Sequence, residues 1–115
     1  MLEASIIFFV IAALLGVILL TKILRNQPTP KPVKFMHGII AGIALLMLVT
    51  YVVLGHTSTL LITSLVLFIL AAMGGLTLFT LDMSGKRIPR ALALGHPALA
   101  IISLILLIIY IVKLV

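Results

Sequence analysis

Residues 5–24 read SIIFFVIAALLGVILLTKIL, and residues 64–83 read SLVLFILAAMGGLTLFTLDM. Each stretch is almost uninterrupted in its apolar character and has about the length of a helix that crosses the hydrocarbon core of a bilayer. At a shift of 59 residues the two stretches match without a gap, including a serine, a phenylalanine, two alanines, a glycine and a threonine. The pair therefore predicts transmembrane helices and an internal repeat.

The same composition extends over the whole chain of 115 residues, which is 64% hydrophobic and 9% charged. Soluble domains are about 45–50% apolar and about 25% charged, so a soluble enzyme, a disordered tail and a nucleic-acid-binding module are excluded. Helices are the expected spanning form because lipid does not satisfy an open strand edge. The predicted spans are about Ser5 to Leu24, Phe35 to Leu54, Leu60 to Leu81, and Leu92 to Val112.

Groups with ligand chemistry are scarce in this sequence. There is no cysteine, which excludes disulfides, thiolate metal sites, iron–sulfur clusters and covalent c-type haem attachment. The only acidic residues are Glu3 and Asp82, and the sequence indicates no chemical role for Asp82. The three histidines are therefore the main candidates for binding chemistry.

The basic residues predict the orientation. Glu3 precedes the first apolar run and Lys22 and Arg25 follow it, which is the reverse of a signal peptide, so we expect a retained first span. Seven of the eight basic residues lie in the first and third loops: Lys22, Arg25, Lys31, Lys34, Lys86, Arg87 and Arg90. The positive-inside rule makes these loops cytoplasmic and both termini external. We expect a bacterial inner membrane.

The internal repeat continues beyond the two quoted stretches. The other informative matches are Pro30 with Pro89, Lys31 with Arg90, His37 with His96, and Tyr51 with Tyr110. We predict an all-α membrane protein with one transmembrane domain over residues 1–115, in which a two-helix hairpin is duplicated in tandem. Repeat one covers residues 1–56 and repeat two covers residues 60–115. Each repeat crosses the membrane twice, so a pseudo-twofold axis along the membrane normal relates the repeats of this four-helix bundle.

His37 and His96 begin the second and fourth spans, so this axis predicts that they face each other at one depth. Neighbouring helices pack about 8–10 Å apart, and diagonal helices are then about 12–14 Å apart. That spacing leaves room for a flat macrocycle between two imidazoles, as in bis-histidine haem proteins. We predict haem b, with His37 and His96 as its axial iron ligands near the cytoplasmic side.

Small and basic residues near the histidines support this prediction. Gly16 and Gly75 lie about 9 Å from the cytoplasmic ends of their spans and are expected to give the macrocycle flat space. Lys31, Lys34 and Arg90 are expected to pair with the haem propionates at the membrane edge. The small residues expected to extend the flat surface are Ala12, Ala13, Ala71, Ala72, Gly38, Ala41, Gly42 and Ala100.

His37 followed by Gly38, together with His96 and the predicted bundle, resembles the small membrane cytochromes b, including the cytochrome b561 group. The resemblance implies a haem b electron carrier, either a membrane oxidoreductase or an electron-transfer subunit, that exchanges electrons with quinone or a redox partner protein. The cytochrome b561 pattern has two histidine pairs, one near each face, and this chain has one internal pair. His56 has no counterpart in the repeat, so we expect it in a turn, and a second haem would need His56 of another subunit.

Other classes of protein stay open at this point. A structural or assembly subunit of a larger membrane complex is one, because small residues in membrane helices ordinarily serve close packing. A four-helix transporter is another, and small multidrug-resistance proteins resemble this chain in size. Those proteins depend on a buried acid in the first span, where this chain has only Glu3 at the edge. A metal ion on two histidines lacks the three or four ligands of most zinc sites, although a homodimer would supply four.

Overall fold

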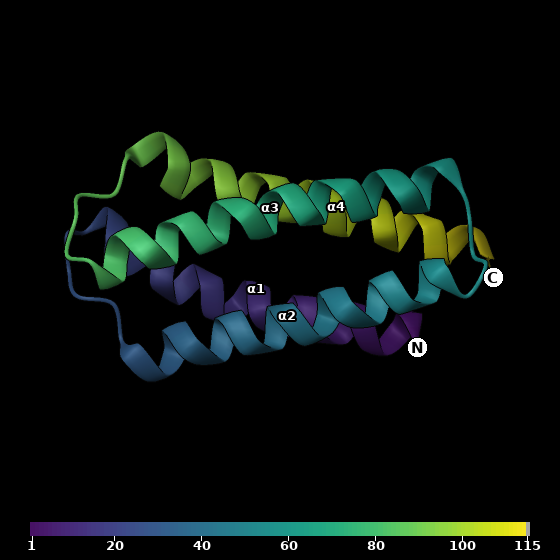
Figure 1. Cartoon of the computed structure of the whole chain (residues 1–115), viewed down its shortest axis with the longest axis horizontal. Helices are drawn as coiled ribbons and strands as arrows, with labels where there is room; N and C mark the ends of the chain where they lie inside the picture. Colours follow the sequence, from purple (N-terminus) through teal and green to yellow (C-terminus); the bar gives the residue numbers. More distant parts are fainter. Residues whose placement is uncertain (115) are drawn as a thin grey trace.

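The computed structural model describes residues 1–114, which form four α-helices in an antiparallel bundle (Figure 1). The helices are α1 (Leu2–Leu24), α2 (Lys31–Val53), α3 (Thr59–Met83) and α4 (Arg90–Leu114). All four are long and apolar enough to cross a membrane by length and composition, so the predicted all-α four-helix fold is confirmed. Val115, the last residue of the second predicted repeat, lies outside the described residues.

The helices extend past the predicted spans at most of their ends. The apolar runs mark only the part of each helix that fits hydrocarbon, whereas the helical turns at the ends contain polar residues. The start of α2 is an example, because the helix begins at Lys31 with Pro32 in its first turn. Proline is tolerated there because the first backbone N–H groups of a helix have no intrahelical acceptor.

The turns that follow α1 and α3 are built alike. Asn26 and Gly85 both adopt left-handed backbone conformations, with φ of 54° and 68°. One residue further on, the N–H of Gln27 donates to the carbonyl of Lys22 at 2.8 Å, and the N–H of Lys86 donates to that of Leu81 at 3.0 Å. This hydrogen-bond pattern satisfies carbonyls left free at a helix end. Both loops lie at the same end of the bundle (Figure 1).

Helices pack most closely within each hairpin, α1 on α2 and α3 on α4, and the α1–α4 and α2–α3 contacts join the hairpins more sparsely. The Ser5 hydroxyl donates to the Ala44 carbonyl at 2.9 Å, and the Ser64 hydroxyl donates to the Ser103 carbonyl at 2.8 Å. These two bonds occupy positions 59 residues apart. The contacts of the two hairpins therefore correspond in detail, and the origin of this correspondence in a duplication stays a prediction.

The core lies along the centre of the bundle. Phe9 of α1 and Phe68 of α3 stack there, with ring centroids 3.9 Å apart and planes 4° from parallel. Large apolar side chains also cover the outside of every helix, and Leu14, Leu46 and Leu76 are 64–68% exposed. Helices that are apolar on all sides are typical of membrane spans. This surface is compatible with an integral membrane protein.

A facing histidine pair as the candidate functional site

The fold brings His37 and His96 together near the end of the bundle that carries the two loops. Each is the seventh residue of its helix, in α2 and α4 respectively. Their ring centroids are 6.2 Å apart and the ring planes are perpendicular. Both side chains are half-buried. The predicted juxtaposition of the two histidines is therefore present in the structure.

Each imidazole is held by a backbone carbonyl of the neighbouring helix in its own hairpin. His37 Nδ1 lies 2.7 Å from the Ala12 carbonyl oxygen, and His96 Nδ1 lies 2.7 Å from the Ala71 carbonyl oxygen. A carbonyl oxygen only accepts, so Nδ1 carries the proton and donates in both rings. In the neutral ring Nε2 then presents its lone pair. A histidine that ligates a metal almost always donates its other N–H in this way.

Gly16 and Gly75 are the reason that the rings fit against α1 and α3. A Cβ atom at Gly16 would lie 3.0 Å from His37 Cε1, and one at Gly75 would lie 2.9 Å from His96 Cε1. These distances are too short for ordinary carbon contacts, so both imidazoles lie against bare backbone. The histidine rings lie beside these glycines, and the expectation that the glycines also border a macrocycle stays a prediction.

Several other small residues also do not border the histidines. A Cβ atom at Gly38 or Gly42 would meet nothing within 4 Å, and both glycines face outward from α2. Ala13 is exposed as well, whereas Ala12 and Ala71 are buried and supply the carbonyls described above. The prediction of a flat surface extended by Ala13, Gly38 and Gly42 is wrong, because these positions lie on outward faces of their helices.

Gly75→Ala is expected to displace the His96 ring and break its hydrogen bond to Ala71. The cost is about 1–3 kcal/mol, typical of overpacking a tight site. In protein labelled with ¹⁵N-histidine, the hydrogen-bonded Nδ1–H resonance of His96 should disappear while that of His37 remains. Gly74→Ala is the matched control, because its Cβ would lie at an ordinary 3.8 Å from His96 Cβ. Equal spectra for the two variants would contradict this role of Gly75.

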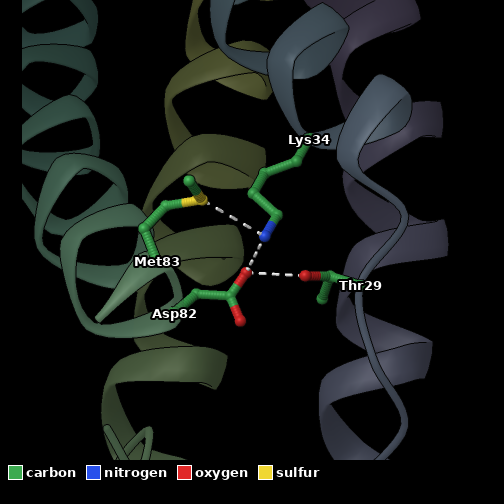
Figure 2. Close-up of polar contacts among 4 residues, drawn as sticks. All are labelled: Thr29, Lys34, Asp82 and Met83. Atoms are coloured by element: carbon green, nitrogen blue, oxygen red, sulfur yellow. Dashed lines mark hydrogen bonds and ion pairs between the residues drawn. The ribbon is translucent and has the colours of Figure 1, made fainter. Parts of the chain in front are cut away.

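The predicted propionate-binding cations do not all have the same surroundings. Lys34 forms an ion pair with Asp82, and the Thr29 hydroxyl donates to the same carboxylate oxygen at 2.6 Å (Figure 2). Lys34 also lies 3.7 Å from the sulfur of Met83. This network joins the first hairpin to α3, so Lys34 is not a free cation. Lys31 and Arg90 are exposed at the first residues of α2 and α4.

His56 lies in the turn between α2 and α3, at the opposite end of the bundle (Figure 1). Its Nδ1 is 2.9 Å from the Tyr51 carbonyl oxygen, and its ring stacks on Tyr51 with centroids 3.8 Å apart. These contacts agree with the expected role in a turn. Among the described residues no group of three or more His, Cys, Asp or Glu side chains could hold a metal ion.

Comparison with protein families, curated proteins and solved structures finds no match. The interpretation of the histidine pair therefore depends on its own geometry. That geometry is two neighbouring imidazoles with ring centroids 6.2 Å apart and perpendicular planes, each with Nδ1 held by a backbone carbonyl.

Proposed function

We propose that this protein is an integral membrane haem b protein that holds the haem iron between His37 Nε2 and His96 Nε2 and carries single electrons. The observation that carries the proposal is the pair of imidazoles opposed at 6.2 Å, each with its Nδ1–H donated to a carbonyl. The backbone bonds set the tautomer that metal ligation needs, and they orient both rings from helices α1 and α3.

The spacing of the rings fits two ligands of one metal atom. A metal–imidazole nitrogen bond is about 2.0–2.1 Å long, so rings on opposite sides of one metal have centroids about 6 Å apart. The observed distance is 6.2 Å. The Nδ1–H of each ring is held by a backbone carbonyl, which leaves Nε2 as the nitrogen proposed to bind the metal. The donors are neutral, in keeping with the scarcity of carboxylates.

The macrocycle itself has to lie between the hairpins. The contacts between hairpins are sparser than those within them, so the boundaries between α1 and α4 and between α2 and α3 are where a porphyrin can enter. Binding therefore requires the hairpins to part at the end with the loops. Lys31 and Arg90 begin their helices six residues before the histidines, about 9 Å along the axis, and are the cations proposed for the propionates.

Haem b with two histidine ligands supplies reversible transfer of one electron at the iron. The protein part of this role is to fix both ligands and to exclude water with the surrounding apolar helices. We further propose quinone or a redox protein as the electron-exchange partner, and a bacterial inner membrane with the basic loops on the cytoplasmic side. The resemblance to small membrane cytochromes b supports the same role.

The test is the absorption spectrum of the full chain, produced with ample haem and purified in detergent. We expect about one haem per protein chain. Its spectrum should be that of a six-coordinate low-spin haem in both the oxidised and the dithionite-reduced states. A folded, helical protein that stays colourless in the presence of haem would overturn the proposal.

A structural or assembly subunit is the second candidate. The close contact of the imidazoles with Gly16 and Gly75 favours it, because the rings already fill the space between helices. On this view the histidines are packing residues that satisfy Nδ1 through backbone carbonyls. The two candidates differ in the spectrum just described, since a purely structural pair binds no haem.

A further inference from the structure

A hollow opens between the two loops at the end of the bundle near the histidines. Its polar wall consists of Asn26, Gln27 and Thr29 from the first loop, Asp82 at the end of α3, Lys86 and Arg87 from the third loop, and Arg90 at the start of α4. The rest of the wall is mostly apolar and comes from the end of α1 and from the residues around the start of α4. The hollow is therefore amphipathic, with donors on its polar side and hydrocarbon beside them.

The charge of this hollow is positive and is not neutralised by the protein. Lys86, Arg87 and Arg90 are all exposed. Asp82 is the only carboxylate in the wall, and it is already paired with Lys34. The other acidic residue of the chain, Glu3, begins α1 at the opposite end of the bundle. The three cations thus face the hollow without an acidic partner among the described residues.

We infer that this hollow binds the phosphate group of an anionic phospholipid. Guanidinium groups bind phosphate oxygens with paired, charge-assisted hydrogen bonds, and the side-chain amides of Asn26 and Gln27 add neutral donors. The hollow lies at the ends of the apolar helices, which is the level of lipid headgroups, and its apolar wall suits the lipid backbone. Basic pockets between membrane helices have this chemistry.

This inference does not require haem binding, although Arg90 lines the hollow and is also proposed for the haem propionates. It uses Arg87 and Lys86, which the proposed function does not use, and it holds equally for a structural subunit. Free phosphate shares the headgroup chemistry, but it has no apolar part that would contact the apolar wall. The lipid is therefore the ligand that the whole hollow fits, and the experiment separates the two sources.

The test is native mass spectrometry of the purified full chain with phosphatidylglycerol or phosphatidylcholine vesicle lipids. We expect retention of phosphatidylglycerol over phosphatidylcholine, and Arg87→Gln should lower that retention about fivefold to tenfold. Arg25→Gln is the matched control, because Arg25 is exposed in the first loop at the same end of the bundle but does not line the hollow. It should lower the retention less than twofold.

Three results would overturn the inference. Equal losses for Arg87→Gln and Arg25→Gln would mean general attraction to the charged end of the bundle. Equal retention of both lipids would mean that no headgroup site exists. Displacement of the lipid by millimolar inorganic phosphate would make free phosphate the ligand. Lys86→Gln changes a second exposed cation of the hollow and should also lower the retention of phosphatidylglycerol. Circular dichroism verifies that each variant keeps its helices.

Discussion

Replacement of either His37 or His96 by alanine is expected to abolish the six-coordinate low-spin haem spectrum. On the proposed function each substitution removes one of the two proposed iron ligands, and the remaining imidazole would give at most a five-coordinate iron. The two losses should be equal, because the rings have the same hydrogen bond at 2.7 Å and the same glycine contact. Loss of a hydrogen-bond partner behind a metal ligand lowers metal affinity about 10–100-fold. Loss of the ligand itself should lower haem affinity by more than this.

His56→Ala is the matched control for this experiment. His56 stacks on Tyr51 in the turn between α2 and α3, and its loss should leave the spectrum unchanged. Free imidazole supplies a second control, because it should restore the low-spin bands to His37→Ala or His96→Ala by filling the vacated ligand position. A structural role for the histidines would not respond to added imidazole.

The results of the alanine variants separate the assignment of ligands from the presence of haem. If the single variants keep a low-spin spectrum, other groups hold the haem and the histidine pair is structural. If His56→Ala alone loses the spectrum, the cofactor lies at the opposite end of the bundle. Either outcome would contradict the proposed site.

The sequence predicts the helices and the meeting of the histidines well, and both for physical reasons. A span needs only length and apolar composition, which the runs around Phe9 and Phe68 supply without reference to the rest of the fold. The meeting of the histidines is predicted by aligning the two halves of the sequence, because equivalent positions of two parallel hairpins lie at the same depth. His37 and His96 are such a pair, with ring centroids 6.2 Å apart.

The details around that pair could not be predicted in the same way. In a helix that is apolar on every side, hydrophobic periodicity does not mark the face that points inward. Ala13, Gly38 and Gly42 therefore looked equivalent to Ala12 and face outward instead. The role of Gly16 depends on the rotation of α1 against α2, which only the packed structure shows.

The ion pair between Lys34 and Asp82 was missed for another reason. Its partners are 48 positions apart in the sequence and lie on different hairpins. The sequence contains several basic residues that could pair with Asp82, and it does not indicate which of them does. The available signal was that Asp82 is the only acid near loops with seven basic residues. A carboxylate in that position is expected to be paired, and the fold decides which cation pairs with it.

Asp82→Asn is expected to lower the free energy of unfolding by about 2–3 kcal/mol. Loss of one partner from a buried ion pair costs about 3–5 kcal/mol because the other charge is left uncompensated. The lower value applies here, since the side chains of Lys34 and Asp82 are 10% and 24% exposed. The measurement is the midpoint of unfolding as dodecyl sulfate is added to protein in a mild detergent.

Glu3→Gln is the matched control, because Glu3 is 75% exposed and lies 3.7 Å from the N-terminal amine. It should change stability by less than about 1 kcal/mol. The double variant Lys34→Met with Asp82→Asn should lose less than the sum of its two single variants, because neither charge is then left alone. Additive losses would show that the two side chains do not stabilise each other.

The position of this ion pair gives the same variant a second consequence. Lys34 is one turn before His37, and Asp82 is on α3, so the pair holds the hairpins together at the end where haem is proposed to enter. If haem enters there as proposed, parting the hairpins breaks the pair, and the free energy of the pair adds to the barrier to uptake. Asp82→Asn should therefore take up haem faster than the native chain while unfolding more easily, whereas Glu3→Gln should match the native rate. Unchanged uptake with reduced stability would place the entry path away from the α2–α3 boundary.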